Sequence, residues 1–255
     1  MKKIILVLLL ISASAYALEG PDFMLIGDLY VPQPNCFSFA CNSCENQGID
    51  VVFRNASLYK ISSLNWIFAG ASIHSKFGSL AVSFRDYGIN ELYKSTMLSL
   101  YLQKPVYNSI FMRLGYSRKE YSYGVNYYNS TSNVFAFGAG LKFRSFNLSA
   151  IIDNLAFKKE SFNNNPELCF SLFWQADELL TFYAIYFNDN RKHDRLLFGQ
   201  SFMLAKPLNF KAGILMKPDA YYTGFEIVYK RFVFGYTYFD IGGLPDCMRL
   251  TLSYR

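Results

Sequence analysis

Three successive stretches near the end of the chain alternate between apolar and polar residues. From Tyr221 to Tyr229, from Phe232 to Tyr238 and from Met248 to Tyr254, nearly every second residue is aromatic or aliphatic, and most of the residues between them are small or charged. A period of two residues is the period of a β-strand, whose side chains point alternately to the two faces of a sheet. The alternation predicts three consecutive strands. It fits both a soluble sandwich with the apolar face inside and a membrane barrel with the apolar face outside.

The first residues indicate export. Lys2 and Lys3 precede a short apolar run, and Ala15 and Ala17 supply the small residues of a signal-peptidase site. We expect residues 1–17 to be a cleaved signal peptide, because the apolar run is too short for a retained membrane anchor.

The composition of the remaining chain favours the membrane barrel. Aromatic residues make up 18% of the sequence and charged residues only 17%. No later stretch is long and apolar enough for a membrane helix, and the other structure that pairs all its backbone groups within lipid is a closed barrel. The net charge of +6 includes the two lysines of the signal peptide, and no basic run indicates nucleic-acid binding.

The chain after the signal peptide divides into two parts. Residues 18–47 contain three cysteines and no sustained alternation, so we expect a plug or a periplasmic flap. Residues 48–255 contain strand-like runs separated by turn signals, and we predict an all-β, antiparallel, up-and-down transmembrane barrel of about 14 strands. The runs of about 7 to 11 residues suit strands that cross a bilayer at a tilt. They are 49–54, 64–73, 79–86, 95–103, 107–117, 133–143, 145–153, 167–174, 179–187, 195–203, 208–216 and the three stretches described first.

The connections between these runs alternate between short and long. Short ones lie around Lys76, Arg144 and Lys230, whereas long ones include 87–94, 118–132 and 154–166. Bacterial outer-membrane barrels have short turns at the periplasmic end and long loops outside. The alternation therefore predicts a C-terminus in the periplasm.

The stretch from Ala212 to Arg255 resembles the end of the PorV/PorQ-like outer-membrane proteins, which belong with the FadL group of fatty-acid transporter barrels. The resemblance rests on Pro218-Asp219, Gly224-Phe225, the strand from Arg231 to Tyr236 and the terminal run from Arg249 to Arg255. It implies a bacterial outer-membrane barrel. It further implies either a conduit for a hydrophobic or amphipathic molecule, or a barrel that binds secreted or surface proteins.

The cysteines have three interpretations. Cys36, Cys41 and Cys44 have the spacing that begins an iron–sulfur pattern, which requires a fourth thiolate from Cys169 or Cys247. Zinc is a second interpretation. In an exported chain disulfides are favoured, with Cys169 on the inner face as a candidate partner for a cysteine of an inserted plug.

Charged residues on the inner face of the predicted strands are the candidate functional residues. In one interpretation these charges are structural and only pair with one another to fill the bore. In the other they line a passage that favours anionic solutes or carboxylate head groups. The candidates are the cations Arg85, Arg113, Lys142, Lys211, Arg231 and Arg249, facing the acidic residues Asp50, Asp153, Glu167 and Glu226.

Function therefore reduces to three hypotheses. The first is a gated conduit for a hydrophobic, amphipathic or anionic small molecule, with outer-membrane lipids as surroundings. The second is a non-transporting barrel with a secretion-system or surface protein as partner. The third is a rim enzyme built on His193 with Asp189 or Asp194, which no nucleophile spacing supports. We expect no catalytic residues, no metal and no cofactor.

Overall fold

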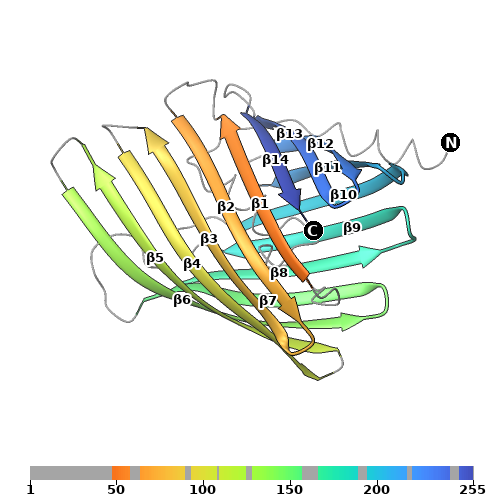
Figure 1. Cartoon of the computed structure of the whole chain (residues 1–255), viewed down its shortest axis with the longest axis horizontal. Helices are drawn as coiled ribbons and strands as arrows, with labels where there is room; N and C mark the ends of the chain where they lie inside the picture. The colour runs from red at the N-terminus through yellow and green to blue at the C-terminus, as the bar shows by residue number, and fades with distance from the viewer. Residues whose placement is uncertain are drawn as a thin grey trace.

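The strands close into one barrel (Figure 1). The computed structural model describes residues 48–57, 64–89, 93–107, 109–124, 128–156, 166–188, 194–216, 220–241 and 247–254. The predicted signal peptide, the predicted plug with Cys36, Cys41 and Cys44, and His193 lie outside the described residues. The strands are β1 (Gly48–Ser57), β2 (Leu64–Ser75), β3 (Gly78–Ile89), β4 (Tyr93–Tyr107), β5 (Ile110–Tyr123), β6 (Tyr128–Phe143), β7 (Phe146–Leu155), β8 (Glu167–Gln175), β9 (Leu180–Asn188), β10 (Asp194–Ala205), β11 (Leu208–Met216), β12 (Ala220–Tyr229), β13 (Phe232–Ile241) and β14 (Cys247–Tyr254).

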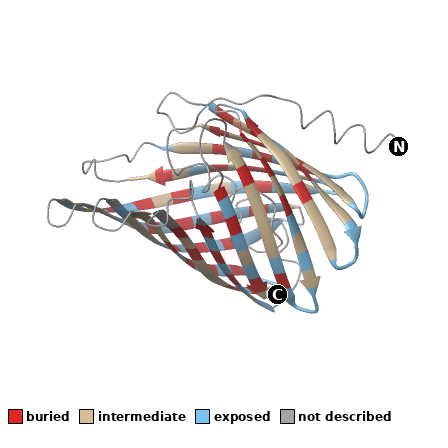
Figure 2. Ribbon diagram, turned by 90° about the horizontal axis from the view of Figure 1, so that it is seen from above, coloured by how far each residue is buried: buried red, intermediate tan, exposed pale blue. Residues whose placement is uncertain are grey.

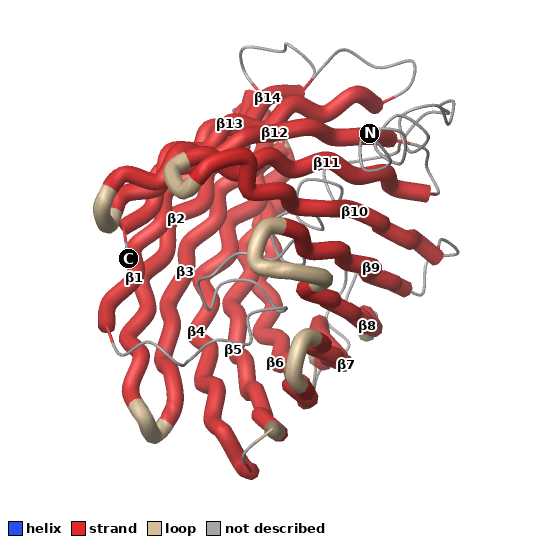
Figure 3. The backbone as a smooth tube through the Cα atoms, turned by 90° about the vertical axis from the view of Figure 1, so that its right-hand side faces the viewer, coloured by secondary structure: helices blue, strands red, loops and turns tan. Residues whose placement is uncertain are grey.

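The prediction of an antiparallel barrel with 14 strands is confirmed. Every strand pairs with its neighbours in sequence, and β14 closes the barrel against β1 with Val51 opposite Tyr254. Closure removes the two free edges that an open sheet would leave, so each wall strand has a hydrogen-bonded partner on both sides. The described secondary structure consists of strands alone, as the tube in Figure 3 shows. Among the described residues, no helix is long and apolar enough to cross a membrane.

The tight connections all lie at one end of the barrel. They join β2 to β3, β4 to β5, and so on to β12 and β13, and both β1 and β14 have their free ends there. In two of these turns Arg144 and Lys230 adopt positive φ angles of 49° and 55°, a backbone conformation that tight hairpins use to follow the twist of the strands.

Several strands are longer than the sequence predicts, and the longest are β4, β5 and β6. β4, β5 and β6 have 15, 14 and 16 residues, and most of the stretch 118–132, which we expected to be a loop, is a paired hairpin with Arg118 opposite Asn133 and Tyr123 opposite Tyr128. Apolar alternation ends near Tyr116, but backbone pairing continues through the polar residues beyond it. Cys247, which we expected in a loop, begins β14 and pairs with Phe239.

The two faces of the wall differ in exposure along every strand. Buried and exposed residues alternate as bands in Figure 2, and the exposed positions are large apolar side chains such as Leu100 (47%), Leu114 (46%) and Leu250 (62%). Most of the buried positions point into the bore, where aromatic, aliphatic and charged side chains pack together. A continuous apolar belt around a closed barrel is the surface that a lipid bilayer covers.

This arrangement predicts a cost for charge that depends on depth. Leu250 lies in the middle of β14, whereas Phe77 lies in a tight turn and is 73% exposed. Leu250→Lys should destabilise the barrel by about 2 to 4 kcal/mol, and Phe77→Lys by about 0 to 1 kcal/mol, because the cost of Lys falls toward the interface. Denaturant unfolding in phospholipid vesicles measures both values, and equal costs would contradict a lipid-facing β14.

Candidate functional site

Among the residues that the structure describes, the inner wall of the bore carries more cations than carboxylates. Strand register places eight described cationic side chains on this face, against four acidic ones. The cations are Arg54, Arg85, Arg113, Lys119, Lys142, Arg195, Lys211 and Arg249, and the acids are Asp50, Asp153, Glu167 and Glu226.

Four of the arginines lie over aromatic rings of the same face. The guanidinium carbons of Arg54 and Arg85 lie 5.0 and 5.6 Å from the ring centre of Phe68, so one ring serves two arginines. Register explains this contact, because Phe68 of β2 is opposite Arg54 of β1 and Arg85 of β3. Arg54 is 1% exposed. A ring face attracts a cation in such surroundings without neutralising its charge.

The same contact recurs elsewhere in the bore. Arg113 lies over Tyr101 at 4.4 Å, and Arg249 lies over Phe239 at 5.3 Å. Arg249 also donates a hydrogen bond to the hydroxyl of Thr237, with 3.3 Å between nitrogen and oxygen. Aromatic rings of the inner face therefore help to position all four arginines.

Two of the acidic residues have close basic partners. Lys211 donates to Glu226 at 2.7 Å between nitrogen and oxygen, with 11% and 15% of the two side chains exposed. Asp50 lies 2.8 Å from Nε2 of His74.

The cluster around His74 is one that sequence reasoning missed. Nδ1 of His74 lies 3.0 Å from the hydroxyl of Ser79, and Nε2 lies 3.1 Å from that of Ser72. The order Asp50, His74, Ser79 has the connectivity of a hydrolytic triad, but the register of β1, β2 and β3 already accounts for these contacts. Ser79 is only 3% exposed, so we interpret the cluster as structural.

A bulge in β7 brings a further group of charges into the bore. Phe135 and Phe137 of β6 pair with Leu155 and Ile152, so the register shifts at Asp153 and Asn154, and Asn154 has a φ of 60°. The shift turns consecutive polar residues inward. Lys119 of β5 donates to the side-chain oxygen of Asn154 at 2.9 Å and lies within electrostatic range of Asp153 and Glu167.

Most of the predicted inner residues are on the inner face, with one correction. Arg85, Arg113, Lys211 and Arg249 are buried, and Lys142, Asp153 and Glu226 are half-buried. Arg231 is not in the bore. It is exposed in the turn between β12 and β13 and donates to the hydroxyl of Tyr254 at 3.1 Å, because the turn begins at Lys230 and ends the alternation there.

Cys169 lies on the inner face and is 3% exposed. Its strand, β8, is not a neighbour of β14, which contains Cys247. The cysteines proposed as its partners lie outside the described residues, so the disulfide interpretation stays a prediction. Among the described residues, no group of three or more His, Cys, Asp or Glu side chains is arranged to hold a metal ion.

Sequence reasoning missed three of the inner cations. Arg54, Lys119 and Arg195 share the parity of the other inner residues of their strands. Arg54 alternates with the outward residues Val51 and Phe53, and this alternation would have identified it as an inner residue. Lys119 required the knowledge that β5 continues beyond Ser117.

Comparison with known proteins shows the fold. No family model matches this sequence, and a search of curated proteins finds no match. Among solved structures, the Acinetobacter baumannii outer membrane protein Omp33 matches with a TM-score of 0.56 and 8% identity, covering 82% of this chain and 98% of that chain. A mutant of the Rhodopseudomonas blastica porin matches with a TM-score of 0.51 and 6% identity, covering 82% and 99%.

The chain therefore has a porin-like, closed 14-strand barrel fold. No family model supports the resemblance to the PorV/PorQ-like proteins and to the FadL group, so it stays a prediction.

The buried ion pair gives a direct test of the inner wall. Glu226→Gln removes the carboxylate that faces Lys211, so we expect a loss of about 1.5 to 3 kcal/mol in the free energy of unfolding, the range for a hydrogen bond to a charged group. Lys94→Gln is the matched control, because the pair of Lys94 and Asp86 spans 3.4 Å with 48% and 27% of the side chains exposed. The control should lose less than about 1 kcal/mol. Equal losses in denaturant unfolding would show that Lys211 does not depend on its carboxylate.

Proposed function

We propose that this protein is a bacterial outer-membrane channel that conducts small anionic or amphipathic solutes through a narrow bore. The observation that carries the proposal is the excess of buried cations on the inner wall, where aromatic rings hold four arginines in place. Rings of cationic side chains are the usual basis of anion preference in pores. The porin-like fold and the apolar outer belt support a membrane location.

The burial of the bore favours a narrow passage over a wide pore. Trp66, Phe68 and Tyr101 point inward and are 1%, 2% and 4% exposed. A bore of 14 strands is wide enough that wall side chains alone do not have to fill it, yet these large side chains are almost fully covered. A solute would pass by contact with arginines and rings rather than through bulk water, which suits an amphipathic anion.

The connections support an orientation for the proposed channel. We place the tight-turn end and the C-terminus in the periplasm, because outer-membrane barrels keep their short turns there. The extended hairpins of β4, β5 and β6 then project toward the outside.

Those projecting strands favour a second candidate function. Strands of 14 to 16 residues exceed the 9 to 11 residues or so that a bilayer requires, so paired strand continues beyond the membrane. A rigid hairpin surface of this kind suits a partner protein, as in the non-transporting alternative. Purification from outer membranes with a stoichiometric protein would favour that function.

Reconstitution in planar bilayers tests the channel. In a salt gradient of KCl we expect small, discrete conductance steps and a reversal potential with the sign of chloride preference. Arg113→Gln and Arg249→Gln should each shift the reversal potential toward zero, because each removes one of the cations of the bore.

Lys94→Gln is the matched control for the channel measurement. Lys94 is exposed on the outer face at the opposite end from the tight turns, so its loss should leave selectivity unchanged. Preference for potassium in the unmodified protein would contradict an anion channel, and absence of conductance would favour the partner-binding alternative.

A further inference from the structure

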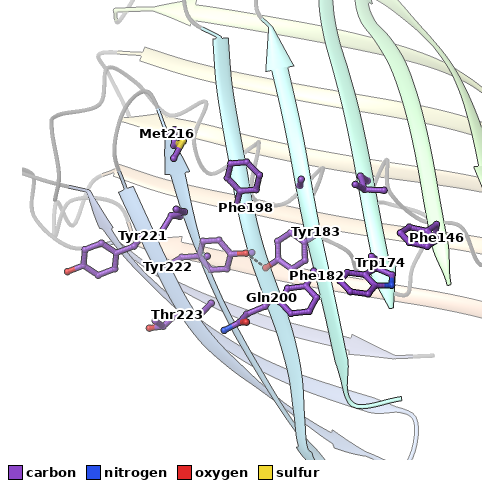
Figure 4. A pocket seen from close by; sticks show the side chains of 16 residues that line it. Phe146, Trp174, Phe182, Tyr183, Phe198, Gln200, Met216, Tyr221, Tyr222 and Thr223 are labelled. Atoms are coloured by element: carbon purple, nitrogen blue, oxygen red, sulfur yellow. Dashed lines mark hydrogen bonds between the residues drawn. The ribbon is translucent and has the colours of Figure 1, made fainter. Parts of the chain in front are cut away.

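The outer wall contains an apolar recess that the channel does not use. Its volume is about 540 Å³, and it crosses β7 to β12 (Figure 4). Its outward lining comes from two adjacent rows of residues that are paired across the strands. The first row is Phe146, Trp174, Phe182, Gln200, Ala212 and Thr223, and the second includes Leu172, Ala184, Phe198, Ile214 and Tyr221.

The first row changes from large to small side chains along the wall. Near the tight turns, the ring centres of Phe146 and Trp174 are 6.0 Å apart and those of Trp174 and Phe182 are 5.6 Å apart, with the planes stacked in both pairs. The next positions are Gln200, Ala212 and Thr223. A stack of three rings therefore ends at side chains without rings, and the step between them forms the recess.

The wall behind the recess is thin. Gly199 and Gly213 are opposite each other in β10 and β11 and carry no side chain. On the inner side, the ring of Tyr183 lies where a Cβ of Gly199 would be, the ring of Tyr222 lies where a Cβ of Gly213 would be, and the two tyrosine hydroxyls hydrogen-bond to each other. These rings cover the inner side, so the recess opens outward and is separate from the bore.

Gln200 is the one amide side chain among the residues that line this apolar recess. It occupies an outward position, opposite Phe182 and Ala212, yet it is only 6% exposed. Its amide lies between Phe182 and Thr223 in Figure 4, and the structure shows no hydrogen bond from it to a described residue. An amide that faces hydrocarbon without a hydrogen-bond partner costs free energy, and a ligand that hydrogen-bonds to it would offset that cost.

We propose that this recess binds one acyl-chain amphiphile from the membrane, with its carbonyl, carboxyl or hydroxyl group hydrogen-bonded to the amide of Gln200. A pocket of about 300 to 1,000 Å³ with apolar walls and few polar groups is typical of small-molecule sites. An amide both donates and accepts, so it suits each of these groups. The chain lies along Ala184, Ala212 and Ile214 against the aromatic stack.

The location of the recess decides between this ligand and a second copy of the chain. The outward residues beside it, Leu172, Phe198 and Met216, are 38%, 37% and 43% exposed, similar to the 47% of Leu100 on the far side of the barrel. The recess is thus an indentation within the lipid-facing belt, where acyl chains are the surrounding medium. A neighbouring barrel with the same belt presents flat rows of Leu and Phe rather than a projection that would enter the recess.

Trp174 provides a fluorescent reporter inside the site. The chain has two tryptophans, and the other, Trp66, is in the bore, so Trp66→Phe leaves Trp174 as the only one. The protein with this substitution, in detergent micelles, is titrated with a long-chain fatty acid brominated at mid-chain, which quenches tryptophan on contact. We expect saturable quenching that the unbrominated fatty acid reverses.

Two variants on this background test the assignment. Ala212→Phe fills the recess and should abolish saturable quenching, whereas Leu100→Phe makes a similar change on the distant outer wall and should leave it intact. Gln200→Leu should weaken binding about fivefold, the net effect of one hydrogen bond, and should not weaken binding of a brominated alkane. Far-ultraviolet circular dichroism verifies that each variant keeps its β-structure.

Three results would overturn the proposal. Quenching that rises linearly and equally in all variants would mean partitioning over the whole belt. Unchanged affinity in Gln200→Leu would mean that the amide does not recognise the ligand. A dimer or trimer in detergent that Ala212→Phe dissociates would make the recess a contact between copies. None of these results bears on the selectivity of the bore, so this proposal and the channel proposal can fail separately.

Discussion

The rest of the structure depends on the hydrogen bonding of the backbone. Within hydrocarbon each N–H and C=O must find a partner in the protein, and a sheet does so only by closing on itself. The pairing of β1 with β14, which sets Val51 to Ser57 opposite Tyr254 to Met248, is therefore decisive. Closure also fixes the parity of each strand, that is, which side chains face lipid and which face the bore. A slip of one residue would exchange the two sets along a whole strand.

Parity explains why the charges could be read from the sequence. A charged residue within an apolar alternation, such as Arg113 or Arg249, can point only into the bore of a closed barrel, and the structure has both there. Arg231 shows the limit of the argument, because parity holds only inside a strand and the turn at Lys230 reverses it. The number of strands was predictable for the same reason. The ends of β5 and β6 were not, because pairing continues after the apolar pattern stops.

The contacts of the bore could not be predicted, since they depend on register between strands. Phe68 meets both Arg54 and Arg85 because β2 lies between β1 and β3 with these residues opposite one another. A shift of two residues would keep every parity and break both contacts. The bulge at Asp153 and Asn154 was equally unpredictable, because no local pattern in the sequence indicates it. It adds a residue to β7 and brings Asn154 into contact with Lys119.

The wall between bore and lipid is a single sheet, so the packing of one face sets the shape of the other. Tyr183 and Tyr222 can lie flat on the inner side only where Gly199 and Gly213 carry no side chain. Aromatic rings that cover glycines in this way restore packing that the glycines would otherwise lose. On the outer side, Gln200 and Ala212 adjoin the same two glycines and do not fill the space beside the stacked rings of Trp174 and Phe182. The aromatic inner surface and the outer recess are thus two consequences of one local arrangement, in which ring volume lies on the inside of β10 and β11 and is missing from the outside.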